Sequence, residues 1–542
     1  MGTGSIRFRA IGLVAALILL NASLSFESAW PTPGVVWRGA LSIELAALLL
    51  ALVLIGPRLV HSRRVLRWVT GVWLALVAGH YATVSATSLY GRDVNLFWDL
   101  RFVPDVVALL ARPERVWVVA LAVIAAVLLA LLGYTVLLWA LGRVWQAMGH
   151  PSERRAVGAV VGAVMAAWVA TEIGVPYSPV FAPPVTQTYV RQARLMAASV
   201  GRSTVLPPSP PMNSDLSRVQ GTDVFLFFIE AYGAVSFDRP EFSARLAEDR
   251  ARLESAIRDT NRQVVSAYVE SPTFGGSSWL AHISFLSGVE VRSHDANALL
   301  MSQRRDTLVT LFKQRGYRTV AVMPGTWQQW PEGRFYGFDV VYGGEQLGYR
   351  GPPFGWWDMT DQFTLARLDE LEVGRSGRAP LFVLFPTIST HIPFTPTPPY
   401  QPDWSRMLTA TPYDERELER AYERQPDWLD LGPSYVDAVS YEYQALAGYV
   451  RQPRGRDFVM ILIGDHQPAA AVSGERAPWD VPVHVITGRS AVLDRLKRHG
   501  FRQGLTPVRP TLGPMHLLTP VVLDAFGDAP GTAADTQQGE QH

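Results

Sequence analysis

A pair of serines that follows two glycines is the part of this sequence whose residue types most directly indicate chemistry. Ser277 and Ser278 come after Gly275 and Gly276, within the segment SPTFGGSSWLAHISFLSG at positions 271–288. Apolar residues recur after the serines at helical spacing, which predicts a helix that begins at this pair. A serine in that place lies beside unpaired backbone N–H groups, which favour a bound anion. The competing interpretation is an ordinary helix cap, because serine is a preferred capping residue.

Acidic residues and histidines that end other apolar segments favour the functional interpretation. Four of them follow the runs VFLFFI, FVLF and VMILIG, and these are Glu230, His391, Asp465 and His466. Such groups are costly to bury unless they are paired or bind a metal ion. Each alone could be a helix cap or a satisfied loop histidine, but together they predict one site.

The segments that must position these residues alternate between short apolar runs and helical patterns. The runs typical of strands buried on both faces are Val224–Ile229, Val264–Val269, Thr319–Met323, Phe382–Phe385 and Phe458–Ile463. The helical patterns between them include Glu241–Arg262, Asp306–Arg315, Gln362–Leu371 and Tyr435–Val450. This alternation predicts an α/β domain with a largely parallel sheet between helices. Ligands gather at the C-terminal ends of such strands, so the polar residues should meet in one crevice.

The residue types of this set indicate a metal-assisted nucleophile. Glutamate, aspartate, histidine and a serine oxygen suit Mn²⁺, Mg²⁺ or Zn²⁺. We predict one divalent ion, with Mn²⁺ favoured, bound by Glu230, Asp465, His466 and the oxygen of Ser277. Such an ion would stabilise the serine alkoxide and polarise an incoming phosphoryl group. The sequence has no cysteine, which excludes disulfides, thiolate metal sites and cysteine nucleophiles.

The order FIEAYG, FGGSSW, THIPF and IGDHQP resembles the alkaline phosphatase superfamily. Within it, the chain resembles the membrane-anchored sulfatase-like branch of lipoteichoic acid synthases and of phosphoglycerol and phosphoethanolamine transferases. The resemblance implies that Glu230, Ser277, Asp465 and His466 are the metal ligands, with Ser277 as the nucleophile. It also implies that His391 contacts the substrate.

The segment around Trp357 resembles the stretch that lines the donor pocket of lipoteichoic acid synthases. The residues that carry this likeness are Trp356, Trp357, Asp358 and Asp361, and we expect Trp357 and Asp358 to bind substrate. Trp356 and Trp357 could equally be packed in the hydrophobic core, and the two interpretations have about the same weight. His282 and His484 are expected to be structural, since five positions separate His282 from Ser277 and turn it off that face of the helix.

The sequence also departs from the patterns of the related enzymes. The transferases usually carry threonine in a Gly-x-Thr-Ser context, where this chain has Gly276-Ser277-Ser278. Ser277 is the better positional match, and Ser278 stays the alternative. Phosphoethanolamine transferases usually have disulfides, which a chain without cysteine cannot form. Sulfatases need a Cys or Ser followed by x-Pro-x-Arg for conversion to formylglycine, whereas Ser277 is followed by Ser278, Trp279, Leu280 and Ala281, so a true sulfatase is not expected.

Five apolar segments in the first third of the chain predict a membrane region. They are Ala10–Phe26, Leu41–Ile55, Trp68–Leu89, Val116–Leu141 and Ala156–Val175. Each is near the roughly 20 residues that span a bilayer. Arginines crowd the second and fourth connections, so the positive-inside rule places the N-terminus in the cytoplasm and everything after Pro176 outside it. The third connection, Gly91–Arg115, is expected to lie at the outer interface.

These features define the expected organisation of the chain. The predicted parts are a five-helix transmembrane region (1–176), a linker with a short helix and a Pro-rich stretch (177–219), a sulfatase-like catalytic domain (220–527) and a disordered tail (528–542). The net charge of +1 gives no electrostatic basis for binding nucleic acid.

The predicted function is that of a multi-pass enzyme of the inner membrane with a periplasmic catalytic domain. It would move a phospho-head-group such as phosphoglycerol from a phospholipid donor to an envelope glycan or polyol, through a covalent phosphoserine. A phosphodiesterase, phosphatase or other sulfatase-like hydrolase is the alternative that uses the same chemistry with water. A non-catalytic envelope scaffold is the alternative of another class, and the intact set of Glu, Ser, Asp and His argues against it.

Overall fold

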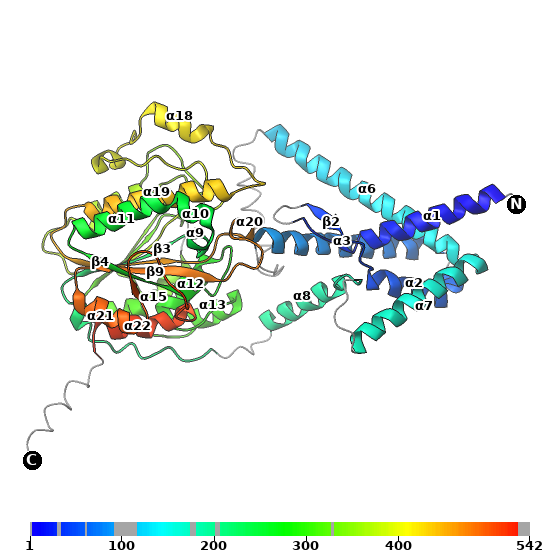
Figure 1. The fold of residues 1–542 in the computed structure, drawn as a ribbon, viewed down its shortest axis with the longest axis horizontal. Coiled ribbons are helices and arrows are strands. Elements are labelled where there is room, and N and C mark those ends of the chain that lie inside the picture. The colour runs from blue at the N-terminus through cyan, green and yellow to red at the C-terminus, as the bar shows by residue number, and fades with distance from the viewer. Residues whose placement is uncertain are drawn as a thin grey trace, which may run out of the picture. The chain divides into compact units, whose positions relative to one another are not determined.

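The chain divides into two compact units, Met1–Ser203 and Thr204–His542, in a computed structural model (Figure 1). The model describes residues 3–29, 34–59, 62–90, 116–173, 180–200, 206–326 and 330–528. The division lies inside the segment predicted to be a linker. The predicted interfacial segment Gly91–Arg115 and the predicted tail beyond Asp528 lie outside the described residues.

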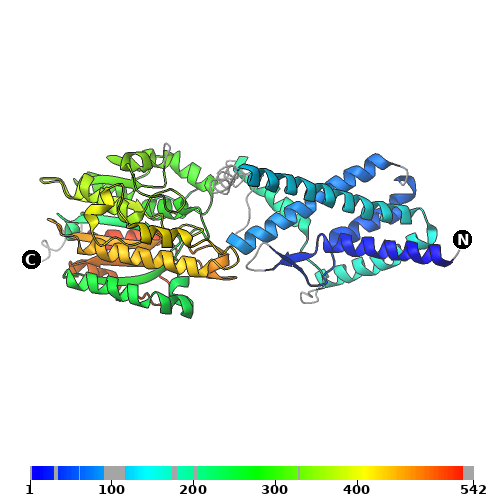
Figure 2. The same cartoon turned by 90° about the horizontal axis from the view of Figure 1, so that it is seen from above.

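The N-terminal unit contains a helix at each of the five predicted apolar segments (Figure 2). These helices are α1 (Thr3–Ala22), α2 (Ile43–Leu59), α3 (Arg63–Tyr90), α6 (Val116–Met148) and α7 (Pro151–Ile173). Among the described residues, α3, α6 and α7 are long and apolar enough to cross a membrane. The apolar parts of α1 and α2 are shorter. Three candidate spans are therefore established, and five spans stay a prediction.

Hydrogen bonds of Asn21 explain its place in an apolar segment. Its Nδ2 donates to the carbonyl of Ala40 at 2.8 Å, and its Oδ1 accepts from the backbone N–H of Ser42 at 2.9 Å. The connection that it ties down includes the antiparallel strands β1 (Phe26–Ser28) and β2 (Val35–Trp37). The short helix expected in the linker is α8 (Val185–Val200).

The C-terminal unit is built on an eight-stranded sheet with the order β10-β4-β9-β8-β3-β7-β5-β6. The strands are β3 (Asp223–Ile229), β4 (Gln263–Glu270), β5 (Arg318–Met323), β6 (Val340–Gly343), β7 (Leu381–Pro386), β8 (Phe458–Gly464), β9 (Asp480–Thr487) and β10 (Arg502–Gln503). Strand β3 pairs in parallel with β7 and β8, whereas β9 runs antiparallel between β8 and β4. The predicted α/β fold with a largely parallel sheet is confirmed, and each of the five predicted strands is present.

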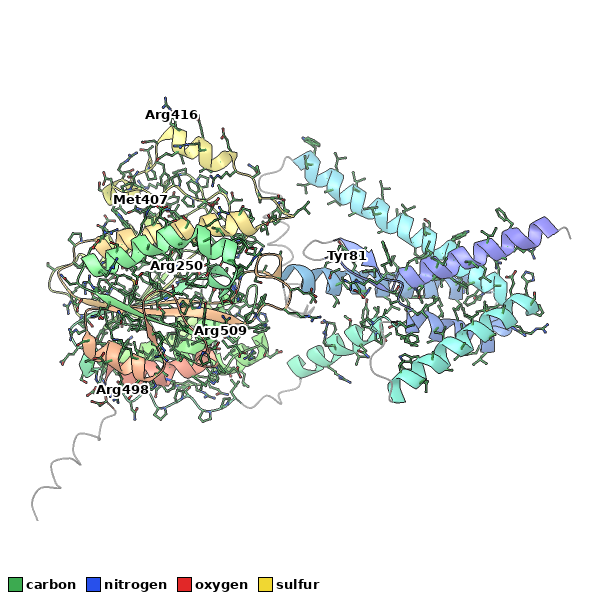
Figure 3. The ribbon with its side chains drawn as sticks, in the orientation of Figure 1. Tyr81, Arg250, Met407, Arg416, Arg498 and Arg509 are labelled. Carbon is green, nitrogen blue, oxygen red and sulfur yellow. The ribbon has the colours of Figure 1, made fainter. Side chains whose placement is uncertain are left out.

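Helices cover both faces of this sheet. The helices of the C-terminal unit are α9 (Val235–Asp238), α10 (Pro240–Arg245), α11 (Ala247–Asp259), α12 (Ser278–Ser287), α13 (His294–Met301), α14 (Leu308–Gln314), α15 (Pro331–Tyr336), α16 (Gly344–Leu347), α17 (Asp361–Leu368), α18 (Glu415–Glu423), α19 (Gly432–Arg451), α20 (Ala470–Ser473), α21 (Ser490–Arg498) and α22 (Leu518–Phe526). The long helix predicted over Glu241–Arg262 is interrupted at the buried Leu246, which separates α10 from α11. Arg416 of α18 and Arg498 of α21 lie at the outside of the unit (Figure 3).

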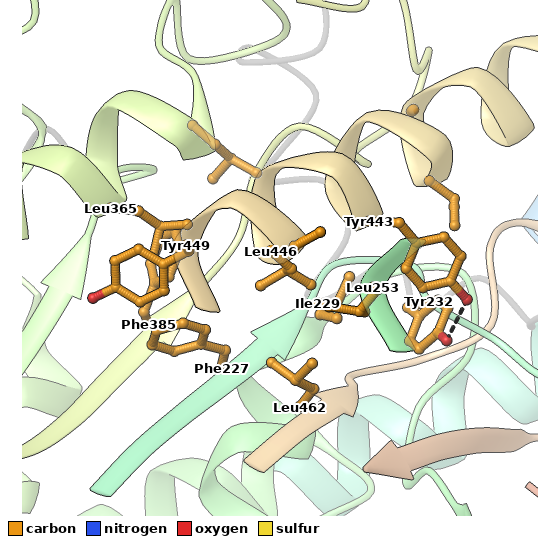
Figure 4. Close-up of a cluster of buried hydrophobic side chains, with 14 of the residues drawn as sticks. Phe227, Ile229, Tyr232, Leu253, Leu365, Phe385, Tyr443, Leu446, Tyr449 and Leu462 are labelled. Atoms are coloured by element: carbon orange, nitrogen blue, oxygen red, sulfur yellow. Dashed lines mark hydrogen bonds between the residues drawn. The ribbon is translucent and has the colours of Figure 1, made fainter. Parts of the chain in front are cut away.

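Alternate side chains of β3 enter two separate cores, because successive residues of a strand point to opposite faces. Phe225, Phe227 and Ile229 pack with residues of α11, α17 and α19. Val224, Leu226 and Phe228 pack with residues of α12, α14, α21 and α22. The first core is shown in Figure 4, where the phenol groups of Tyr232 and Tyr443 are hydrogen-bonded at 2.6 Å. With both faces covered, the polar edge at the strand ends is the place left for a site.

Candidate functional site

Residues that follow four strands meet at the C-terminal edge of the sheet. Glu230 follows β3, the serine pair follows β4, His391 follows β7, and Asp465 and His466 follow β8. One carboxylate or imidazole atom from each of Glu230, Asp465 and His466 lies within 4.8 Å of the others. A crevice of about 300 Å³ is lined by Glu230, both serines, His391 and other residues. The structure thus brings together residues that are up to 236 positions apart, from Glu230 to His466.

Ser278 is the serine whose hydroxyl joins this cluster. Its Oγ donates to Glu230 Oε2 at 2.9 Å and lies 3.2 Å from His466 Nε2. Ser277 precedes the first residue of α12 and makes no capping hydrogen bond with its side chain. Both serines line the crevice. The geometry therefore favours the alternative, Ser278, over the better positional match, Ser277.

The turn before α12 explains why the second serine faces the cluster. Gly275, Gly276 and Ser277 have φ values of 63°, 140° and 63°, respectively. Glycine adopts such angles readily, but a residue with a side chain in this region is strained by about 1–2 kcal/mol. Strain of this kind is concentrated at functional sites. The left-handed conformation at Ser277 turns the chain so that α12 starts with the Ser278 hydroxyl beside Glu230.

The two carboxylates of the cluster are buried next to each other. Glu230 is 8% exposed and Asp465 is 1% exposed. Asp465 Oδ1 accepts hydrogen bonds from the backbone N–H groups of Ala231 at 2.8 Å and His466 at 2.7 Å. The backbone N–H of Glu230 donates to Thr387 Oγ1 at 3.1 Å, which fixes the end of β3 against the loop after β7.

The pKa shifts of Glu230, Asp465 and His466 indicate that this cluster has too little positive charge to balance its two carboxylates. Burial, followed by the charge of Glu230, raises the pKa of Asp465 well above its usual value. Burial opposes a charged imidazole at His466, but Asp465 and Glu230 raise its pKa to about 9. Burial is the largest single influence on the pKa of Glu230 and would raise it, but the charge and hydrogen bond of His466, together with His391 and Asp465, lower that pKa overall. A divalent cation would supply the charge that a proton supplies here.

The donor atoms fit such a cation. His466 Nδ1 lies 2.7 Å from the carbonyl of Gln467, to which it donates, so in the neutral ring that binds a metal Nε2 carries the lone pair. That Nε2 is 3.4 Å from Glu230 Oε1 and 3.8 Å from Asp465 Oδ2. Two carboxylates, one imidazole and a serine hydroxyl form an oxygen-rich set without sulfur, which suits Mn²⁺, Mg²⁺ or Zn²⁺.

His391 and Trp357 form another part of the crevice wall. His391 Nδ1 lies 2.7 Å from the carbonyl of Ile392, which leaves its Nε2 for a substrate. Burial lowers the pKa of His391, so its imidazole is neutral at pH 7. The rings of Trp356 and Trp357 contact the imidazole edge-on, at 5.0 and 4.8 Å between ring centres. Trp357 lines the crevice, whereas Asp358 is not among the lining residues. The substrate-binding roles predicted for both residues stay predictions.

Asp361 holds the loop that carries His391, a role that its sequence position did not reveal. Its carboxylate accepts hydrogen bonds from the backbone N–H groups of Ile388 at 2.9 Å and Ser389 at 2.6 Å. Asp361 is fully buried beside Glu442, which is 1% exposed. Burial raises the pKa of Asp361 to about 6, and burial together with the charge of Asp361 raises the pKa of Glu442 well above its usual value.

The two other buried histidines differ from each other. His484 is hydrogen-bonded at both nitrogens, by Ser266 Oγ at 2.6 Å and Tyr232 OH at 3.1 Å, which confirms its structural role. His282 lines the crevice, so the expectation that it faces away from the nucleophile is wrong. Its spacing of four residues from Ser278 was the signal that could have placed it there.

Comparison with known proteins agrees with the motifs. Residues 284–485 match the model of the Sulfatase family. This range includes His391, Asp465 and His466 and begins after the serine pair. No match was found among curated proteins.

Several solved structures are similar to part of the chain at low sequence identity. An alkaline phosphatase superfamily protein from Vibrio parahaemolyticus is 16% identical with a TM-score of 0.39, over 61% of this chain and 73% of its own. The lipoteichoic acid synthase LtaP from Listeria monocytogenes is 12% identical with a TM-score of 0.39, over 61% and 77%. The Streptococcus pyogenes phosphoglycerol transferase GacH, solved with sn-glycerol-1-phosphate, is 11% identical with a TM-score of 0.32, over 49% and 69%.

Residues 284–485 of the C-terminal unit therefore match the family that the sequence motifs pointed to. The match supports the predicted recognition of a sulfatase-like enzyme domain.

Proposed function

We propose that this chain is a metal-dependent phosphotransferase of the cell envelope, with Ser278 as its nucleophile. It takes a phospho-head-group from a membrane phospholipid and passes it to a hydroxyl of a glycan or polyol. The observation that carries the proposal is the hydrogen bond of 2.9 Å from Ser278 Oγ to Glu230, inside the buried cluster with Asp465 and His466. A catalytic nucleophile needs such a neighbour, since a free serine hydroxyl is a weak nucleophile.

Glu230, Asp465, His466 and the Ser278 oxygen would hold one divalent ion, which we propose to be Mn²⁺. When bound, this ion would lower the pKa of the serine hydroxyl and polarise the phosphoryl oxygens. The oxygen-rich ligand set supports Mn²⁺ or Mg²⁺, and the imidazole is equally compatible with Zn²⁺.

The protein residues carry the reaction in two displacements. Ser278 Oγ attacks phosphorus and loses its proton, while the bond from phosphorus to the lipid glycerol oxygen breaks and that oxygen leaves with a proton as diacylglycerol. The acceptor hydroxyl then attacks the same phosphorus and loses its proton, and the bond to Ser278 Oγ breaks. His391 lines the crevice with a free Nε2, from which it can hold the proton of the leaving or the attacking oxygen.

The covalent step is tested by intact-mass measurement of the full-length protein in detergent with Mn²⁺. Vesicles of phosphatidylglycerol or phosphatidylethanolamine serve as donors, and the mass increase identifies the head group. Peptide mapping should place the adduct on Ser278. An adduct on Ser277 would show that the nucleophile is the other serine, and release of the group to water without any acceptor would favour a phosphodiesterase.

We further propose five membrane spans, with the N-terminus in the cytoplasm and the catalytic unit outside it, facing the periplasm. The apolar length of α3, α6 and α7 and the arginines in the first turns of α3 support this arrangement. A reporter that is active only outside the cytoplasm, fused after Asn213, should be active, and the same reporter fused after Arg63 should be inactive. Activity only in the second fusion would contradict the proposed orientation.

A further inference from the structure

His282 is a buried side chain of the crevice whose polar atoms are not fully used by the protein. It is 7% exposed, and its Nε2 is buried with no hydrogen-bond partner among the described residues. Its ring packs on Phe228 at 4.4 Å between ring centres. Most buried polar atoms in proteins are hydrogen-bonded, and one that is not destabilises the fold. An apolar side chain would fill this place against Phe228 at lower cost, so the imidazole calls for a functional explanation.

The position of His282 on α12 directs it to the reacting group. Ser278 is the first residue of α12 and His282 is the fifth, so the two are neighbours on one face of the helix. Helical side chains lean toward the N-terminus, which brings the imidazole over the turn that carries Ser278. Both residues line the crevice.

His282 is separate from the residues that would hold the metal. The three whose ligand atoms lie within 4.8 Å of one another are Glu230, Asp465 and His466, and His282 is not among them. A neutral imidazole has one N–H donor, and the group that enters this crevice in the proposed reaction bears negatively charged oxygens.

We propose that His282 contacts the substrate by donating a hydrogen bond to a nonbridging oxygen of the phosphoryl group that is bound at Ser278. The inference rests on the proposed transfer to Ser278 and adds a residue to it. Charge on these oxygens is redistributed as the bond to Ser278 forms and breaks. A fixed N–H donor in a site that excludes water stabilises such charge without reorganisation.

The experiment uses orthovanadate, which mimics the transferring phosphoryl group, with the full-length Mn²⁺-loaded protein in detergent. Calorimetry gives its affinity for wild type, His282→Phe, His282→Gln and a control, His516→Phe. The control makes the same chemical change at a histidine that also has a buried unpartnered nitrogen but does not line the crevice. His282→Phe should bind vanadate on the order of 100-fold more weakly, in the range seen when one such donor is removed.

Two further readouts separate this role from a structural one. His282→Phe should have a higher melting temperature than wild type, because the unpartnered nitrogen is gone and packing on Phe228 is kept. It should also form the Ser278 adduct more slowly by a similar factor. His282→Gln, which keeps a donor, should recover part of the affinity, and His516→Phe should bind vanadate as wild type does. If His282→Phe does not fold, His282→Leu replaces it under the same criteria.

The outcomes distinguish this inference from the proposed function. Wild-type affinity and wild-type adduct rate in His282→Phe would overturn the role of His282 and leave transfer to Ser278 standing. A wild-type protein that neither binds vanadate nor forms the adduct would overturn the proposed function and this inference with it. Weaker binding in His282→Phe with an unchanged control supports the hydrogen bond.

Discussion

A carboxylate is buried at each end of strand β3, and the two carboxylates differ in the groups that balance their charge. At the first end, Asp223 is fully buried and accepts hydrogen bonds from Arg378 Nη1 at 2.7 Å and Nη2 at 2.6 Å. The backbone N–H of Leu381 adds a third at 2.9 Å. At the other end, the one ion pair of Glu230 within the described part of the chain is with His466, whose imidazole is shared with Asp465.

This difference separates a structural carboxylate from one that is available to a ligand. A bidentate arginine neutralises Asp223 inside the fold, which leaves nothing for a ligand to supply. The Glu230 end has two carboxylates and one titratable histidine, so its charge is balanced only by a proton or by an added cation. Both ends look alike in sequence, because each is an acidic residue next to the same apolar run.

The largest expected effect on turnover comes from removing the Ser278 hydroxyl, which is hydrogen-bonded to Glu230. Ser278→Ala should lower the turnover of phospholipid donor by a factor on the order of 10⁴ or more, because the group that forms the covalent bond is removed. Ser277→Ala, which removes the neighbouring hydroxyl, should stay within about tenfold of wild type. Turnover is measured as diacylglycerol release from vesicles. The reverse result would restore Ser277 as the nucleophile.

Substitutions at the two ends of β3 test the comparison itself. Glu230→Gln should weaken Mn²⁺ binding about 100-fold, because an oxygen-rich site depends on its charge count, and leave the metal-free protein folded. Asp223→Asn should leave Mn²⁺ affinity unchanged and lower the free energy of unfolding by about 3–5 kcal/mol, because Arg378 is left buried without its partner. Calorimetry measures the first effect and chemical denaturation the second. Equal Mn²⁺ affinity in the two variants would contradict the assignment of Glu230 to metal binding and of Asp223 to the stability of the fold.

Another pair of buried carboxylates, Asp361 and Glu442, has no arginine in an ion pair with it among the described residues and is not part of the metal cluster. The folded-state pKa of Asp361 is raised from 3.8 to about 6, so the folded protein retains a proton that the unfolded chain releases. The free energy of unfolding should therefore be highest below the lower value and fall as the pH rises through the higher one. Glu442→Gln should be more stable than wild type by about 2 kcal/mol at pH 8 and similar to it at pH 4. Parallel pH profiles of the two proteins would show that the pair is not linked to stability.

The smallest expected effect is at the aromatic wall of the crevice. Trp357→Ala should raise KM for the phospholipid donor by about fivefold to tenfold with a smaller change in kcat, because it removes contact area and not a reacting group. Trp356→Ala is the matched control, since Trp356 contacts His391 at a similar distance but is not among the lining residues. Equal effects of both changes would assign Trp357 to the support of His391.

The sequence alone predicted five of the eight strands of the sheet and the strand ends at which the candidate site lies. Five apolar runs predicted five strands, and parallel strands place their C-terminal ends on one edge. This is why Glu230, Asp465 and His466 were predicted to meet and why Asp223 was not included with them. Strands β6, β9 and β10 were not predicted: β6 and β10 are short, and Pro482 and His484 interrupt the apolar pattern of β9.

The tertiary structure decided which serine faces the cluster and how each buried charge is balanced. The choice of Ser278 depends on the backbone angles of Gly275, Gly276 and Ser277, which residue spacing does not specify. The partner of Asp223 lies 155 positions away at Arg378, and the loop that Asp361 holds begins 27 positions after it. Contacts between residues so distant in sequence form only when the chain is folded, and they determine whether a buried carboxylate supports the fold or is available to bind a ligand.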